Sequence, residues 1–158
     1  MTPRFARIML FVIAFWVYII DRIAKLVAIK MLHAGQSVPV KPGIFHITLV
    51  LNNGAAFGLF KDRAAFFVAV SAAAVAAIMV YAWRHKGMAP PLAVSFGLIL
   101  GGALGNLVDR VSFGYVIDYF DFRVWPVFNV ADSAITIGVT LLIATTLFTK
   151  RHNASRFV

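Results

Sequence analysis

The stretch IMLFVIAFWVYII, residues 8–20, contains no charged residue. Its apolar pattern continues past Asp21 and Lys25 to about residue 29. A helix needs about 20 mainly apolar residues to cross the hydrocarbon of a bilayer. Charges follow this stretch instead of the small-residue cleavage pattern of a signal peptide. We therefore predict an uncleaved membrane span over residues 8–29.

Three further apolar stretches of similar length follow, over residues 64–83, 91–107 and 131–148. The chain is 61% hydrophobic and only 13% charged, whereas about 25% of residues are charged in a typical soluble domain. These features predict a single membrane domain over residues 1–158. Its fold class is an all-α integral membrane protein with four transmembrane helices.

The third of these stretches carries a regular set of glycines. Gly97, Gly101 and Gly105 recur at every fourth residue. Small residues at this spacing form a stripe along one side of a helix, which lets a second helix approach closely. We predict that this stripe packs against another span.

Lysine and arginine are distributed unequally between the two ends of the predicted spans. The net charge of +9 comes from short basic groups beside apolar stretches, which is typical of membrane topology and not of a nucleic-acid surface. Because cytoplasmic loops carry the excess of basic residues, both termini are expected in the cytoplasm. All six acidic residues, each an Asp, then fall on or near the outer face. The side that holds the termini has no acidic residue and carries Arg4, Arg7, Arg84, Lys86, Lys150, Arg151 and Arg156.

The two outer loops cover residues 31–63 and 108–130. Within the first, apolar and more polar residues alternate from Phe45 to Asn52 and are followed by an Asn-Gly pair. Alternation with a period of two indicates a strand, and Asn-Gly marks a turn. Because unpaired strand edges cannot lie in hydrocarbon, we expect a small β subdomain on the outer, periplasmic side of the membrane.

Two polar groups lie at the ends of predicted spans. Asp21 and Lys25 are four residues apart, so they share one helix face, where an ion pair stabilises the end of the first span. Asp132 lies in the first turn of the fourth span, where capping is one interpretation. However, Asn129 is the better N-cap candidate. The polar string formed by Asn129, Asp132 and Ser133 therefore favours a functional role for Asp132.

Asp118 has apolar neighbours on both sides, so its carboxylate is costly unless a proton is shared. Two carboxylates that meet at one water can hydrolyse a peptide bond, with one protonated to polarise the carbonyl and the other ionised to deprotonate the water. Asp118 and Asp132 can both reach the outer surface. Spacing alone leaves Asp109 and Asp121 as alternatives, although Arg110 is expected to neutralise Asp109.

Other catalytic chemistries lack their residues. Without cysteine there is no thiol nucleophile and no cysteine-based zinc site, and without glutamate there is no HExxH motif. A serine triad would need a histidine near Ser133. The predicted topology places His85 and His152 on the cytoplasmic side, and His33 and His46 are isolated loop residues. Phosphate loops and dinucleotide fingerprints are also missing. We expect no metal and no cofactor.

Five short motifs follow one another along the chain: Asp21–Lys25 (DRIAK), Asn52–Phe57 (NNGAAF), Gly105–Arg110 (GNLVDR), Val116–Asp118 (VID) and Phe128–Ser133 (FNVADS). In order and content they resemble the motifs of the lipoprotein signal peptidases, the signal peptidase II family of aspartyl peptidases. The resemblance covers nearly the whole chain. One departure is Arg22, where the family usually has Gln.

The resemblance implies roles for individual residues. Asp118 and Asp132 match the catalytic aspartates of the family. Asp21 and Lys25 would support the structure, and further residues would line the site, orienting the substrate backbone and the catalytic pair. These expected substrate-binding and supporting residues are Asn52, Gly54, Asn106, Arg110, Asn129 and Ser133.

The resemblance also implies the substrate and the location. The enzyme would lie in the bacterial inner membrane and cut a prolipoprotein just before the cysteine that carries diacylglycerol. Such a substrate can diffuse laterally among membrane lipids to a site near the periplasmic face. Globomycin, a cyclic-peptide inhibitor of the family, would occupy the same site. No nucleic-acid partner is expected.

Two other classes of protein are open on the residues alone. A four-span transporter or proton-coupled exporter should carry its key acid near the middle of the bilayer, whereas the charged residues here collect at one interface. A noncatalytic scaffold could use the glycine stripe for assembly. That alternative leaves the aspartates and asparagines unexplained.

Overall fold

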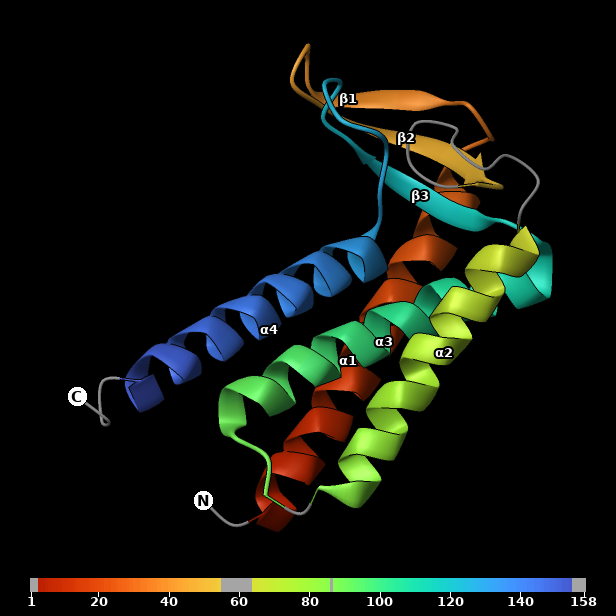
Figure 1. Ribbon diagram of the computed structural model, residues 1–158. Helices are drawn as coiled ribbons and strands as arrows, with labels where there is room; N and C mark the ends of the chain where they lie inside the picture. The colour runs from red at the N-terminus through yellow and green to blue at the C-terminus, as the bar shows by residue number, and fades with distance from the viewer. Residues whose placement is uncertain (1–2, 55–63, 86, 155–158) are drawn as a thin grey trace.

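The computed structural model describes residues 3–54, 64–85 and 87–154. Four helices and three short strands make up this part of the chain (Figure 1). In order, they are α1 (Pro3–Met31), β1 (Ser37–Lys41), β2 (Phe45–Asn52), α2 (Ala64–Arg84), α3 (Pro90–Phe113), β3 (Val116–Asp121) and α4 (Val130–Ala154).

Helix α3 is the centre of the bundle, because it packs against α1, α2 and α4. Its glycines make this possible. A Cβ atom on Gly97 or Gly101 would lie 2.8 Å or 2.6 Å from a backbone oxygen of α1, and one on Gly102 would overlap the carbonyl oxygen of Ala131 in α4. The glycine stripe therefore packs against α1, as the sequence predicts, and the adjacent Gly102 provides a second close approach, to α4.

The strands form an antiparallel sheet in the order β1-β2-β3. The sheet covers the end of the bundle opposite both termini (Figure 1). Leu49, Ile117 and Tyr119 are almost fully buried and form a small apolar core with Ala28 of α1. This core fixes the sheet on the C-terminal end of α1, and so it holds the side chains of β3 near the first turn of α4.

The expected strand over residues 45–52 is present as β2, but the expectation for residues 108–130 needs correction. Helix α3 does not end near residue 107 but continues to Phe113, because no helix breaker occurs before Gly114, which caps it with φ 79°. Asp109 and Arg110 are therefore helical and not loop residues. The strand β3 lies in the remainder of this segment and was not predicted.

Three helices of the described part of the chain are long and apolar enough to cross a membrane: Ala65–Arg84, Pro90–Phe113 and Val130–Leu147. Helix α1 is 29 residues long. It is not among these three, since its second half carries Asp21, Arg22 and Lys25. The structure confirms a mainly helical protein with a small sheet and three helices that could cross a membrane.

We predict that Gly101→Ala lowers the melting temperature of the purified protein, by an amount equivalent to about 1–3 kcal/mol for overpacking. The added methyl group would meet the carbonyl oxygen of Ala14 at 2.6 Å. Gly87→Ala is the matched control, since no described atom lies within 4 Å of a Cβ at that position. Equal melting temperatures for the two variants would contradict the role of the close α1–α3 approach.

Candidate active site

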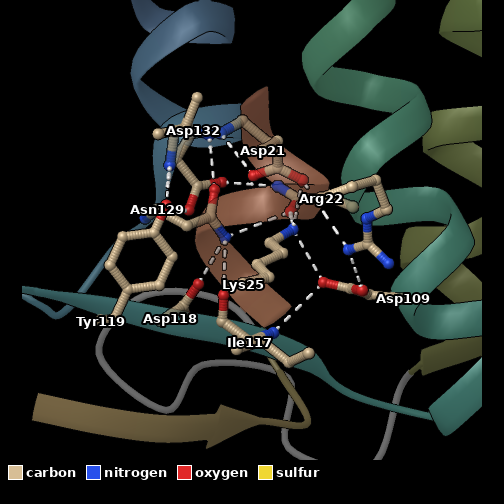
Figure 2. Close-up of polar contacts among 12 residues, drawn as sticks. Asp21, Arg22, Lys25, Asp109, Ile117, Asp118, Tyr119, Asn129 and Asp132 are labelled. Carbon is tan, nitrogen blue, oxygen red and sulfur yellow. Dashed lines mark hydrogen bonds and ion pairs between the residues drawn. The ribbon is translucent and has the colours of Figure 1, made fainter. Parts of the chain in front are cut away.

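A cluster of buried polar side chains lies where the sheet meets α1, α3 and α4 (Figure 2). Burial of so many polar groups in an apolar bundle is costly unless each finds hydrogen-bond partners. The members at most 5% exposed are Asp21, Lys25, Asn106, Asp109, Asp118 and Asn129.

Asp118 lies in β3, opposite Val50 of β2. Its two carboxylate oxygens accept hydrogen bonds from Asn52 Nδ2 at 2.9 Å and from Asn129 Nδ2 at 2.6 Å. Burial first, and then the nearby Asp132 carboxylate, raise the pKa of Asp118 to about 7, although the two asparagine donors oppose the shift. The Asp118 carboxyl can therefore hold or release a proton near neutral pH.

Asp132 is held by the N-terminus of α4. Asn129 caps the helix, because its Oδ1 accepts a hydrogen bond from the Asp132 backbone N–H at 2.9 Å. In return, the Asn129 backbone N–H donates to Asp132 Oδ2 at 3.2 Å, which completes a reciprocal cap. The other oxygen, Oδ1, accepts from Asn106 Nδ2 at 2.7 Å. The Asp132 carboxylate thus takes part in the cap and is also held by a hydrogen bond from Asn106 of α3.

A cavity of about 290 Å³ opens beside both carboxyl groups. Three of the expected substrate-binding residues line it, Asn52, Gly54 and Arg110, together with Asp118 and Asp132. The rest of its wall is mainly apolar and includes Phe67, Val116, Trp125 and Phe128.

Ser133 faces an adjoining groove and not this cavity. The groove measures about 420 Å³, shares Asp132, Trp125 and Phe128 with the cavity, and follows α4 to Ile137. The Ser133 hydroxyl donates to the carbonyl oxygen of Asn129 at 2.9 Å. A mainly apolar groove along α4 therefore reaches Asp132.

The expected pair of Asp21 and Lys25 is present, with 2.9 Å between Lys25 Nζ and Asp21 Oδ2. The expected neutralisation of Asp109 by Arg110 is wrong. Asp109 pairs with Lys25 at 2.7 Å and also with Arg22, both from α1. Adjacent residues on a helix point about 100° apart, so Arg110 faces the cavity while Asp109 faces α1.

Asp121, the other alternative acid, does not line the cavity and has hydrogen-bond partners elsewhere. Its side chain accepts hydrogen bonds from Thr48 Oγ1 at 2.7 Å and from the backbone N–H of Arg123 at 2.8 Å. Burial alone would raise its pKa, but the hydrogen bonds from Thr48 and Arg123 outweigh it and leave the pKa of Asp121 below its usual value.

Three residues near the site were not singled out from the sequence. Phe67 and Trp125 line the cavity, and the Tyr119 hydroxyl accepts a hydrogen bond from the Val130 backbone N–H at 3.3 Å. Trp125, an aromatic residue beside a proline in an outer loop, could have been noticed. Phe67 carries no such signal, because it lies in a uniformly apolar helix.

Within the described residues, no three His, Cys, Asp or Glu side chains are placed to hold a metal ion. The donors that face the cavity are the amide of Asn52 and the guanidinium of Arg110, beside the two carboxyl groups. Such a set can activate a water by proton transfer and bind a carbonyl oxygen by hydrogen bonds.

Two solved structures described as bacterial membrane enzymes share this fold. One aligns with a TM-score of 0.82 at 34% sequence identity and covers 88% of this chain and 87% of its own. The other aligns with a TM-score of 0.77 at 34% identity, covering 86% and 90%. Together with the apolar helices, these similarities define a multi-pass bacterial membrane enzyme.

The sequence comparisons specify the family. The model of the family described as signal peptidase (SPase) II matches residues 13–148. A lipoprotein signal peptidase of Halothermothrix orenii is 42% identical over 85% of this chain and 92% of that protein. A lipoprotein signal peptidase of Moorella thermoacetica is 46% identical over 82% and 87%. The chain belongs to the signal peptidase II family, whose members are proteases that process prolipoproteins.

The raised pKa of Asp118 predicts how stability depends on pH. Between the usual value of 3.8 and about 7, the folded state holds a proton that the unfolded state has released. This contribution to stability is fully present below pH 3.8 and is lost as the pH rises through 7. We therefore expect the melting temperature of Asp118→Asn to fall less than that of the wild type between pH 3.8 and about 7, as measured by thermal unfolding in detergent.

Asp121→Asn is the control for this measurement, and its effect has the opposite sign. A lowered pKa stabilises the fold above the usual value, so this variant should lose stability at neutral pH and approach the wild type in acid. Parallel melting curves for the wild type and Asp118→Asn across the range would contradict the shift at Asp118.

Proposed function

We propose that this chain is an aspartic endopeptidase that removes the signal peptide from diacylglyceryl-modified prolipoproteins, with Asp118 and Asp132 as the catalytic pair. The observation that carries the proposal is the shared cavity. Only these two acidic side chains of the described residues line it, and the pKa of Asp118 is raised to about 7 with Asp132 as one of the causes. A carboxyl group whose pKa is raised by a neighbouring carboxylate can keep a proton while that neighbour is ionised.

The pair would then divide the chemistry of hydrolysis. The ionised carboxylate takes a proton from a water molecule, whose oxygen attacks the carbonyl carbon of the scissile peptide bond. The protonated carboxyl donates a hydrogen bond to the carbonyl oxygen. When the tetrahedral intermediate breaks down, a proton passes to the amide nitrogen, the carbon–nitrogen bond breaks, and the new amine leaves.

The amides around the pair keep both carboxyl groups in position. The Gly54 backbone N–H donates to Asn52 Oδ1 at 3.0 Å, so the Asn52 NH2 group faces Asp118. The capping bond fixes Asn129 in the same manner, with its NH2 group toward Asp118. Arg110, whose guanidinium carbon lies 5.2 Å from the centre of the Phe67 ring, supplies the positive charge of the cavity and is proposed to orient the substrate backbone.

The apolar parts of the substrate also find suitable surfaces. The groove along α4 joins the cavity at Asp132 and is lined mainly by apolar groups, among them Phe122, Trp125 and Ile137. We propose that it receives an apolar portion of the lipidated substrate from the surrounding membrane lipids. Globomycin-type inhibitors are then expected to compete with the substrate for the cavity.

The proposed topology has four spans, with α1 as the first, in the bacterial inner membrane. Basic residues near both termini favour a cytoplasmic location for that end of the bundle. The sheet lies at the other end (Figure 1), which would be the periplasmic face. The cavity is lined by residues of β2, β3 and the start of α4, and so it lies at the same end. A lipidated cysteine on the periplasmic surface would then lie level with the carboxyl pair.

We predict that Asp118→Asn and Asp132→Asn each reduce cleavage of a lipidated prolipoprotein in reconstituted membranes by at least ~10³-fold, because no proton donor and acceptor remain as a pair. Asp109→Asn and Asp121→Asn are the matched controls and should retain much more activity. A chelator should leave the wild-type rate unchanged. Full activity of either pair variant, in a protein that remains folded, would refute the assignment.

The topology is tested separately with reporter fusions. A fusion at either terminus should report a cytoplasmic location, and a reporter inserted in the turn between β1 and β2 should report a periplasmic one. Both results follow from the excess of basic residues on the side of the termini. A periplasmic signal from either terminus would contradict the proposed orientation.

A further inference from the structure

Three asparagine side chains hold the carboxyl pair, and each has its carbonyl oxygen tied to a separate donor. For Asn52 the donor is the Gly54 backbone N–H, and for Asn129 it is the Asp132 backbone N–H. Asn106 differs, because its donor is the side chain of Lys25, with Nζ at 2.8 Å from Oδ1. The orientation of the third amide therefore depends on a lysine of α1.

Lys25 is 1% exposed, and its ammonium group has three contacts that use its three N–H donors. Nζ lies 2.9 Å from Asp21 Oδ2, 2.7 Å from Asp109 Oδ2 and 2.8 Å from Asn106 Oδ1. Figure 2 shows the Lys25 ammonium group between the carboxylates of Asp21 and Asp109. The two ion pairs balance the charge of the ammonium group, and the contact with Asn106 uses its third N–H donor.

That contact decides which end of the Asn106 amide faces Asp132. An ammonium group only donates hydrogen bonds, so Lys25 requires the carbonyl oxygen of Asn106. An ionised carboxylate only accepts them, so Asp132 requires the NH2 group, which it receives at 2.7 Å. With Lys25 in place, one orientation of the amide satisfies both neighbours. The reversed orientation would set two donors against each other at Lys25 and two acceptors against each other at Asp132.

Among the described residues, the other donor to Asn106 Oδ1 is shared with further acceptors. Asn129 Nδ2 also contacts Asn106 Oδ1, at 3.2 Å. The same nitrogen donates to Asp118 Oδ1 at 2.6 Å and contacts the Ile117 carbonyl oxygen at 3.3 Å, so its two hydrogens already serve three acceptors. It is therefore a more distant and shared donor to Asn106 Oδ1, whereas the Lys25 ammonium group contacts that oxygen at 2.8 Å.

We infer that Lys25 is a positioning residue for peptide cleavage: it acts through Asn106 to hold Asp132 in its reactive orientation. This inference rests on the proposed function of the carboxyl pair and goes beyond it, since Lys25 was expected only to support the structure. Lys25 does not line the cavity and so has no direct contact with the reacting atoms. It affects the reaction through the side-chain amide of Asn106, which contacts both Lys25 and Asp132.

Arg22 provides a matched control. It belongs to the same ion cluster and pairs with Asp109, but it has no hydrogen bond to Asn106. Lys25→Met and Arg22→Met each remove one positive charge and all donors of the side chain. Only the first leaves the Asn106 amide free to turn. A purely structural role predicts that each substitution reduces cleavage only as far as it reduces the amount of folded protein.

The experiment measures kcat for a lipidated prolipoprotein with the full chain in liposomes, at a temperature well below the melting temperature of every variant. We expect Lys25→Met to lower kcat by about 100-fold through the misplaced carboxylate. Arg22→Met should change kcat by no more than about twofold. KM should change little in both variants, because neither residue contacts the substrate.

A double-mutant cycle separates positioning from general destabilisation. If Lys25 acts through Asn106, the double variant Lys25→Met/Asn106→Ala should be no slower than Asn106→Ala alone. The effects of Arg22→Met and Asn106→Ala should instead multiply. Multiplying effects of Lys25→Met and Asn106→Ala, or equal kcat values for Lys25→Met and Arg22→Met, would overturn the inference.

A second variant covers the case in which Lys25→Met does not fold because it leaves buried carboxylates without their partner. Asp21→Asn/Lys25→Met removes one charge of each sign, and so it should restore much of the melting temperature while kcat remains low. Recovery of wild-type kcat in this variant would also overturn the inference. Failure of the proposed function looks different: the wild type would not cleave, or Asp118→Asn would remain fully active.

Discussion

Burial of carboxyl groups at the end of an apolar helical bundle is the constraint on which this structure depends. A buried carboxylate is stable only when its oxygens receive hydrogen bonds or when it keeps a proton. Asp118 and Asp132 receive theirs from Asn52, Asn106 and Asn129, which come from β2, α3 and the start of α4. The sheet and the bundle must therefore meet at one point, and the carboxyl pair lies at that junction.

Because the helices approach one another closely, short side chains on neighbouring helices can form hydrogen bonds with each other. Gly102 brings the first turn of α4 against α3, and the side chains of Asn106 and Asp132 then meet at 2.7 Å. Gly105 has a further role, because a Cβ atom there would lie 2.5 Å from Asp21 Oδ2. Asp21 uses this space to accept a hydrogen bond from the Ala131 backbone N–H at 3.0 Å. A stripe that indicates helix packing thus also makes room for a buried acid.

The ion cluster beneath the pair includes Arg22, the residue at which this chain departs from the motif expected from the family resemblance. Asp21 and Asp109 carry two negative charges, and Lys25 alone would leave one of them unbalanced. Arg22 pairs with Asp109 and supplies the second positive charge. Its side chain is 19% exposed. Arg22 therefore contributes its positive charge at the edge of the cluster, whereas the Lys25 side chain, 1% exposed, contributes its charge in the interior.

The sequence by itself determined the helices, the strand over residues 45–52, the Asp21–Lys25 pair and the Asn129 cap, because each follows from local hydropathy or from spacings within one helix. It left Asp109, Asp118, Asp121 and Asp132 open as members of a carboxyl pair until family motifs were considered. Only the tertiary structure decided that Asp109 faces α1, that Asp121 meets Thr48 and that the other two share a cavity. The physical reason is that hydropathy fixes where a segment can lie, whereas the partner of a buried polar group is set by contacts between residues far apart in the chain, such as Lys25 and Asn106.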